Sequence, residues 1–230
     1  MAVPSHRPRR PRRLAAIGLA LVLAGISPTP AAPVRAGEPD AVSPPAPVSA
    51  IVPGSVNRTS LDVRATYDVD VRIRVAARRV RGWVTITAQN VSGAGIDRLH
   101  LNTVMAPLGA LALGSVTVDD APVGAVVDDQ TIIVPLGGVL PDGETARIVV
   151  PFRATLRDRV GGSAWLFTRA NGIVAMHRWI PWVSLRRPFD RPNHGDPFVT
   201  PVSPRVTVRA WSDVPLRYGT SGRQVAASAD

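Results

Sequence analysis

A period-two alternation over residues 61–75 is the feature that most constrains how this chain can fold. Every odd position is apolar or aromatic, whereas the even positions carry Asp, Arg or Thr. A β-strand points successive side chains to opposite faces, so the pattern predicts a long strand with one buried and one solvated face. The apolar set is Leu61, Val63, Ala65, Tyr67, Val69, Val71, Ile73 and Val75.

Shorter alternations further along the chain predict more strands. Gly82 interrupts the second alternation, which indicates a bulge or a close approach of two backbones. Pro151 cannot donate to a ladder, so its strand is expected at a sheet edge or at a bulge. Pro141-Asp142-Gly143 predicts a turn, and no amphipathic helix follows residue 36. The fold class predicted is all-β, an antiparallel sandwich or a saddle-like sheet. The further alternations cover residues 80–88, 99–101, 116–118, 132–136, 146–156 and 206–210.

The N-terminal residues have the composition of an export signal. An arginine cluster precedes an uncharged run from Leu14 to Ile26, and Val34-Arg35-Ala36 follows with small or compact residues at the positions that a signal peptidase reads. We expect residues 1–36 to be a signal peptide, which makes the protein extracytoplasmic, either secreted or in the cell envelope. Residues 37–56 are rich in Pro and Ala and are expected to form a linker, and residues 57–230 are expected to form one β-domain.

Charge and cysteine content exclude several kinds of partner and site. The net charge is +10, but six arginines and no acid lie within residues 1–36, so the remainder carries +4. A mild positive balance spread along strands argues against a nucleic-acid partner, and no membrane contact is expected after signal removal. Because the chain has no cysteine, it forms no disulfide, no thiolate metal site and no lipidated cysteine.

Several segments between Leu61 and Arg223 resemble, in order, the N-terminal β-domain of the M1 zinc aminopeptidases. Arg178-Trp-Ile-Pro resembles the arginine-x-x-proline segment of that family. The final match resembles the strand that ends that region of the family. The matching stretches are residues 67–75, 80–87, 96–102, 113–120, 136–152, 178–181 and 206–215, with Gly219 and Gly222 after the last.

The resemblance implies a domain that carries no catalytic centre. In the family, a separate domain supplies a helical His-Glu-x-x-His segment and a downstream glutamate for zinc binding and base catalysis. This chain has no such segment, so we expect no cofactor and no peptidase activity from it. A glutamine that contacts substrate in the family corresponds here to Ile173, five residues before Arg178.

Aromatic and arginine residues concentrate between residues 165 and 191. Trp and Arg are enriched at the hot spots of protein interfaces, which makes the cluster a candidate interaction surface. The alternative is a core layer at one end of the sheet with arginines stacked outside it. The candidate interface or loop residues are Trp179, Trp182, Arg178, Arg186 and Arg187, alongside Trp165, Phe167, Phe189 and Arg191.

A loop with Asp190, His194 and Asp196, downstream of His177, offers oxygen and imidazole ligands for a metal. Its three prolines and its turn residues favour a plain polar loop instead, and we predict no metal site.

Three functional hypotheses follow from the sequence. The first is an exported non-catalytic β-domain that serves in interaction or as a scaffold, with a protein partner or a separate catalytic domain. The second is the truncated front part of a secreted zinc-dependent M1 aminopeptidase. The third is a carbohydrate- or protein-binding β-sandwich that uses exposed Trp.

Overall fold

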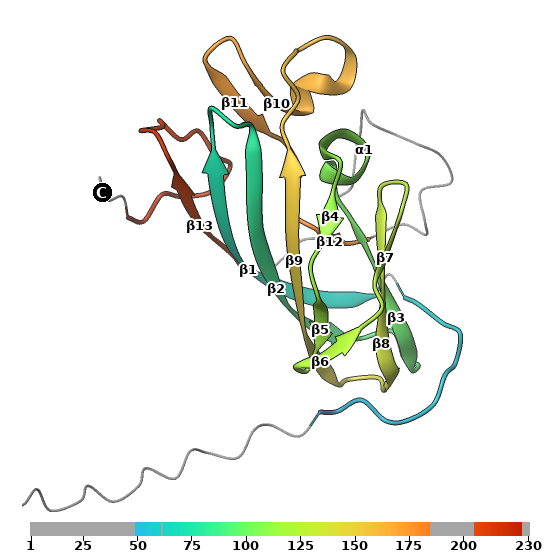
Figure 1. Cartoon of the computed structure of the whole chain (residues 1–230). Coiled ribbons are helices and arrows are strands. Elements are labelled where there is room, and N and C mark those ends of the chain that lie inside the picture. Colours follow the sequence, from blue (N-terminus) through green and yellow to red (C-terminus); the bar gives the residue numbers. More distant parts are fainter. Residues whose placement is uncertain (1–48, 61, 185–204, 227–230) are drawn as a thin grey trace, which may run out of the picture. The chain divides into compact units, whose positions relative to one another are not determined.

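The computed structural model describes residues 49–60, 62–184 and 205–226. These residues form an all-β, sandwich-like domain, as predicted, with a seven-stranded and a four-stranded sheet (Figure 1). The larger sheet has the order β13-β1-β2-β9-β5-β6, and β4 also pairs with β9. Its strands are β1 (Val63–Arg74), β2 (Arg79–Asn90), β4 (Ala112–Leu113), β5 (Val116–Val118), β6 (Ala121–Val123), β9 (Thr145–Thr155) and β13 (Val206–Ser212).

The smaller sheet has the order β12-β3-β8-β7, and a separate hairpin pairs β10 with β11. The predicted turn joins β8 to β9, where Gly143 adopts a φ of 80° that favours glycine. The remaining elements are β3 (Ile96–Asn102), β7 (Val126–Asp128), β8 (Thr131–Leu140), β10 (Phe167–Ala170), β11 (Ile173–Met176), β12 (Trp182–Val183), helix α1 (Met105–Gly109) and a 3-10 turn (Gly162–Leu166).

Strand β1 confirms the alternation read from the sequence. All its odd-numbered residues are buried, whereas its even-numbered residues are exposed or half-buried. Strand β2 pairs with it antiparallel in unbroken register, with Tyr67 opposite Ile86 and Arg72 opposite Arg81. The inner face of both strands is therefore continuous and apolar over their whole length.

Two adjoining cores line that inner face. The larger core fills the space between the two sheets and includes Tyr67, Val84 and Ile148. The smaller core lies at the other end of the same strands, where Val71 and Phe152 pack with residues of α1, the 3-10 turn and β10. The long strands β1, β2 and β9 thus cover both cores with one side and present the opposite side to solvent.

Gly82 allows a close approach of β1 and β2 and does not mark a bulge, since the register runs through it without a break. A Cβ at this position would lie 2.0 Å from the carbonyl oxygen of Asp70 and 3.1 Å from the Cα of Val71. The contacted atoms are backbone atoms, so a side chain here would force the two strands apart.

The strand that contains Pro151 is not an edge strand, contrary to one of the two expectations. β9 lies between β2 and the short strands β4 and β5. The irregularity lies on the side of β9 that faces β4 and β5. There Phe152 pairs with Leu113 and Val149 pairs with Thr117, so the pairing is interrupted between these two positions. The carbonyl of Pro151 accepts a hydrogen bond of 2.8 Å from Gly114 N. The N and C=O of one strand residue point to the same side, so the missing N–H of Pro151 falls at the gap between β4 and β5, where it breaks no ladder.

Strand β13 is one edge of the larger sheet and pairs with β1 in parallel, from Tyr67 opposite Val206 to Ile73 opposite Ser212. Every other strand pair in the described sheets is antiparallel. A local alternation predicts a strand but contains no information on its direction relative to a distant partner. The parallel pair is therefore a tertiary feature.

Residues 49–58 contact the domain, although composition placed the chain up to residue 56 in a linker. Val52 and Val139 exchange two backbone hydrogen bonds of 2.9 and 2.8 Å. Asp97 accepts hydrogen bonds from the hydroxyl of Ser55 and from the backbone N–H groups of the next three residues, at 2.7, 2.8, 2.6 and 3.0 Å. Burial raises the pKa of Asp97, but these hydrogen bonds outweigh it and lower the pKa to about 2.

Candidate functional site

The tryptophan expected at an interface on β12 packs into the core. The rings of Trp182 and Tyr67 meet edge to face with centroids 4.6 Å apart. The Tyr67 hydroxyl accepts a hydrogen bond of 3.1 Å from Val183 N. Tyr67 is fully buried, and burial raises its pKa to about 12 although this hydrogen bond works against the shift. The contact joins β12 of the smaller sheet to β1 of the larger one and is a packing contact.

Trp179 and Arg178 also contribute to packing. The centroid of the Trp179 ring lies 6.1 Å from that of Phe152, at an interplanar angle of 66°, and the half-buried Trp179 packs against both cores. Arg178 adopts a positive φ of 46°, and its carbonyl accepts from Val104 N at 3.1 Å. Arg186 and Arg187 lie outside the described residues. The described members of this candidate interface are half-buried, with both tryptophans packed against the cores, and their role as an interface stays a prediction.

Other residues singled out in the sequence are dispersed. Trp165 is exposed, with its ring 5.9 Å from that of His177, whereas Phe167 is fully buried. Asp190, His194 and Asp196 lie outside the described residues, as do Phe189 and Arg191. Ile173 is exposed on β11. In the part of the chain that the structure describes, no group of His, Asp and Glu residues is placed to hold a metal ion.

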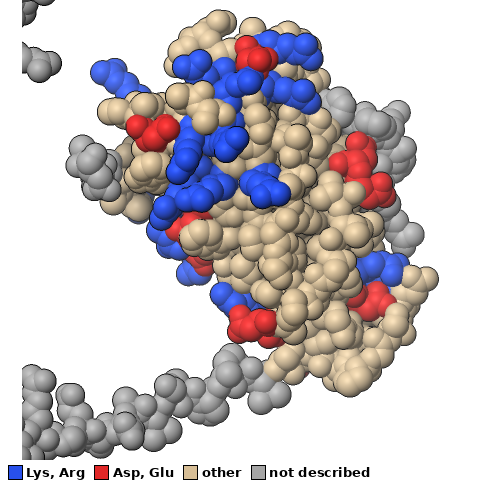
Figure 2. Space-filling model, viewed as in Figure 1, with Lys and Arg blue, Asp and Glu red and all other residues tan. Residues whose placement is uncertain are grey.

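The most distinctive polar feature is on the outer face of the larger sheet. Arg72 of β1, Arg81 of β2 and Arg153 of β9 occupy directly opposite positions and form a row across three strands. Arg74 and Arg79 form a second row beside it. Figure 2 shows basic side chains gathered over the part of this face where β1, β2 and β9 run side by side in Figure 1. We call Arg72, Arg74, Arg79, Arg81 and Arg153 the arginine cluster.

The charges of the arginine cluster are not neutralised. All five side chains belong to exposed residues, and no salt bridge to any of them occurs among the described residues. Like charges directly opposite each other in a sheet lower stability, by about 0.2–1 kcal/mol per pair. Folding alone therefore does not account for placing these arginines side by side.

Acidic side chains on the same face have partners of their own. Arg209 of β13 binds Asp70 through two hydrogen bonds of 2.8 Å. That hydrogen bonding lowers the pKa of Asp70, burial opposes the shift, and the charges of Arg209 and Arg72 add to it. Arg205, just before β13, donates a single hydrogen bond of 3.3 Å to Asp68. Asp70 and Asp68 thus bind arginines outside the cluster, although Asp70 also attracts Arg72, and the cluster keeps a net positive charge.

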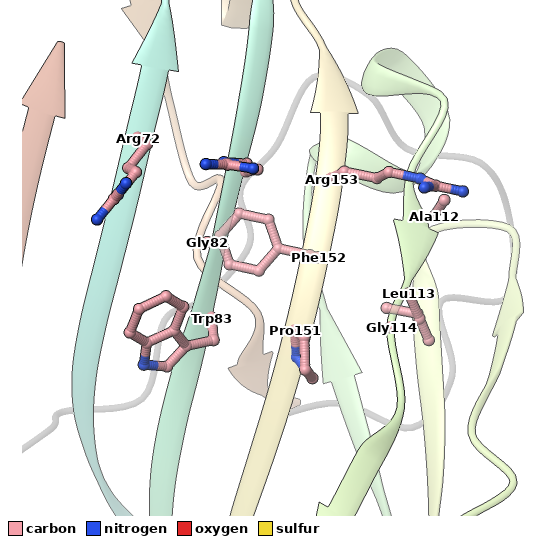
Figure 3. Close-up of a pocket in the computed structure, with 10 residues that line it drawn as sticks. Arg72, Gly82, Trp83, Ala112, Leu113, Gly114, Pro151, Phe152 and Arg153 are labelled. Atoms are coloured by element: carbon pink, nitrogen blue, oxygen red, sulfur yellow. The ribbon is translucent and has the colours of Figure 1, made fainter.

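An open groove of ≈ 450 Å³ runs beside the arginine cluster. Figure 3 shows Arg72 and Arg153 extending on either side of β2, with Trp83 and Pro151 at the next position along the strands. The groove is lined by guanidinium groups and by apolar surface from Trp83, Pro151 and Leu113. The Trp83 side chain is exposed, as is that of Trp211, which lies opposite Arg72 on β13. The groove therefore offers positive charge and apolar contact together.

The sequence contained only half of the signal for this surface. Charged and polar residues fall on the outward positions of the first two alternations, so the sequence predicted a solvated outer face for each strand, with both Asp and Arg on the first. The register that sets Arg72 against Arg81 and Arg153 depends on the pairing of strands far apart in the chain. Trp211 joins the surface only through the parallel β13.

Comparison with known proteins gives structural matches only; no family model and no curated protein matches this chain. The M1 zinc metallopeptidase from Deinococcus radiodurans is similar at 20% identity with a TM-score of 0.44, over 70% of this chain and 34% of that enzyme. A variant of the same enzyme bound to a Tyr-Ser-Ala substrate gives a TM-score of 0.41 over the same shares. A two-domain M1 zinc metallopeptidase bound to L-arginine is 22% identical, with a TM-score of 0.36 over 49% of this chain and 24% of that one.

This chain spans about a third or less of the length of these enzymes. The match covers part of the M1 zinc metallopeptidases, over a stretch the size of one domain. Among the described residues, no helix is long and apolar enough to cross a membrane.

Proposed function

We propose that this protein is an exported, non-catalytic binding domain that holds an anionic partner on the outer face of its larger sheet. The observation that carries the proposal is the arginine cluster, five adjacent guanidinium groups without a neutralising acid among the described residues. Guanidinium groups bind carboxylates, sulfates and phosphates in a planar, two-pronged geometry. An anionic partner would reduce the electrostatic repulsion within the cluster. Binding therefore accounts for the arrangement, whereas folding stability does not.

Binding to a panel of fluorescent anionic probes tests the proposal. The panel comprises an acidic peptide, a sulfated oligosaccharide, a single-stranded oligonucleotide and vesicles containing an anionic lipid. We expect the full chain to bind at least one probe at low salt and the Arg72→Ser/Arg81→Ser variant to bind it about tenfold or more weakly, because charge pairs at an interface are lost.

A matched variant separates the cluster from general charge. Arg64→Ser/Arg169→Ser also removes two positive charges, but from exposed positions outside the cluster. Arg64 is on β1 as well, about 26 Å along the strand from Arg72. This control should keep its affinity within about twofold. Equal losses in the two double variants would refute binding at the cluster.

The non-catalytic part of the proposal rests on the sequence, which lacks the His-Glu-x-x-His segment. Incubation of the protein with zinc and a chromogenic aminoacyl anilide should give no turnover. Metal-dependent turnover that disappears in His194→Ala would contradict it and make the loop around His194 an active site.

Export is proposed from the arginine-rich and apolar N-terminal residues. Material secreted by an expressing bacterium should begin at Gly37, read by N-terminal sequencing. A mature chain that begins at Met1 would contradict cleavage after Ala36.

A second candidate is that the chain acts as the β-domain of a larger zinc aminopeptidase, supplied as a separate or an adjoining catalytic part. The ordered sequence segments from residues 67–75 to 206–215 favour it, since they resemble that domain along most of the β-region. The coding DNA downstream decides the matter: a His-Glu-x-x-His segment there, in frame or frameshifted, would support this candidate over an independent binding domain.

A further inference from the structure

We infer that the anionic partner is an acidic polypeptide segment that lies extended along β2, with acids at alternate positions followed by an apolar residue. The inference rests on the proposed function and specifies its ligand. Its basis is the order of side chains on the outer face of β2, where Arg79, Arg81 and Trp83 follow one another at every second residue.

The spacing of this surface matches that of an extended peptide. Side chains two residues apart on one face of a strand are separated by about 6.6–6.8 Å, because each residue rises about 3.3–3.4 Å. Arg79 and Arg81 have this separation on β2, and Arg74 and Arg72 repeat it directly opposite on β1. An extended peptide with carboxylates at two alternate positions has the same repeat, so each carboxylate can meet one row of arginines.

The third position of the pattern is apolar on β2 and β9, whereas Asp70 on β1, opposite Trp83, is bound by Arg209. Trp83 follows Arg81 on the outer face, with Pro151 directly opposite on β9. Both residues line the groove together with Leu113 and the guanidinium groups of Arg72, Arg81 and Arg153. A peptide reading acid-x-acid-x-apolar places its last side chain against Trp83 while its acids lie over the arginines.

The extent of the positive surface favours a peptide over a long polyanion. Along the strands the cluster is two arginine rows deep, and the next row holds Asp70, bound to Arg209. Nucleic acids and sulfated polysaccharides gain affinity from many contacts along a continuous positive track. A short track that ends at a paired carboxylate and at apolar surface suits a short acidic segment with an apolar residue.

Fluorescence anisotropy with the full chain and a labelled Gly-Glu-Ser-Glu-Ser-Leu-Gly peptide tests the inference. The composition control is Gly-Leu-Glu-Glu-Ser-Ser-Gly, which has the same charge without the alternation. We expect the alternating peptide to bind at least about fivefold more tightly than its isomer, and Arg79→Ser/Arg81→Ser to weaken it about tenfold. Arg64→Ser/Arg169→Ser should change its affinity by less than about twofold.

Trp83→Thr examines the apolar position. Replacing Leu by Ser in the peptide should weaken binding to the unmodified protein and should have little effect on the Trp83→Thr variant, because the two changes remove the same contact. Circular dichroism and the urea midpoint of each variant establish that it is folded. Additive effects of the two changes would contradict contact between Leu and Trp83.

The outcomes separate this inference from the proposed function. Equal binding of the two peptide isomers, or tighter binding of a sulfated oligosaccharide or an oligonucleotide of equal charge, overturns the extended acidic peptide. In those cases, weaker probe binding by the Arg79→Ser/Arg81→Ser variant would still support anion binding on the outer face of the larger sheet. If no probe responds to any substitution in the arginine cluster, both the inference and the proposed function fail.

Discussion

The two ends of the long strands β1, β2 and β9 have equivalent inner faces and different outer faces. At one end the inner face packs in the larger core, and the arginines Arg205, Arg209 and Arg147 outside it each contact an acid. At the other end the inner face packs in the smaller core, and the arginine cluster covers the outside with no such acid among the described residues. Burial of apolar side chains thus explains both inner faces. It does not explain why the arginines outside one core contact acids while those of the cluster do not, and we attribute that difference to function.

The largest expected effect tests the equivalence of the inner faces. Val71→Asp at the arginine end and Ile86→Asp at the opposite end should each lower the free energy of unfolding by about 3–5 kcal/mol, because each buries an unpaired charge. Urea denaturation followed by circular dichroism measures both. Arg72→Asp, one residue from Val71 but on the outer face, is the control and should change stability little. A loss as large as that of Val71→Asp would mean that the side chain of residue 72 is not on the solvent face of β1.

Gly82 lies where the two ends meet, and its substitution tests whether β1 and β2 need close contact there. Gly82→Ala should cost about 2–3 kcal/mol, because the new Cβ would lie 2.0 Å from the Asp70 carbonyl oxygen and backbone must move. Gly161→Ala is the control: no atom lies within 4 Å of its added Cβ and its φ of −68° suits alanine. Equal urea midpoints for the two variants would contradict the close approach.

Asp97 extends the comparison to the smaller sheet, where a carboxylate is stabilised mainly by backbone N–H groups and also lies 3.6 Å from the guanidinium of Arg98. Asp97→Asn should cost about 1–2 kcal/mol at neutral pH, because it weakens the charge-assisted hydrogen bonds from residues 55–58. The pKa of about 2 in the folded protein lies below the ordinary value of 3.8 for an aspartate. The contribution of the ionised carboxylate is therefore complete above about pH 4 and is lost as pH falls toward about 2.

Urea midpoints of the protein and of Asp97→Asn across that pH range measure this effect. The difference between them should shrink as the solution is acidified. A difference that stays constant down to about pH 2 would show that the carboxylate charge has no part in docking residues 55–58.

The smallest effects have opposite signs at the two ends. Arg81→Ser should raise the urea midpoint slightly, because it relieves repulsion from Arg72 and Arg153. Arg209→Ser should lower the midpoint slightly and should raise the pKa of Asp70 toward its ordinary value, read from an NMR titration. Shifts of the same sign would remove the distinction between the two outer faces.

Strand identity and the buried face were predictable from the sequence because both depend on local alternation. Val63 to Val75 follow the predicted inner face without exception in the described residues, and the Pro141-Asp142-Gly143 turn lies where it was expected. The aromatic candidates show the limit of this reasoning. Composition could not tell an interface from a core layer, and only the folded chain brings the half-buried Trp182 and Trp179 against Tyr67 and Phe152.

By itself, the sequence determined an all-β chain and which side chains of each strand face inward, since a period of two is a property of consecutive residues. Only the tertiary structure decided which strands are neighbours. Pairing of β1 with β2, and of β2 with β9, aligned Arg72, Arg81 and Arg153 in one row, and the parallel β13 brought Arg209 to Asp70. Register between distant segments is set by packing over the whole sheet, which is why the arginine cluster is visible only in the folded molecule.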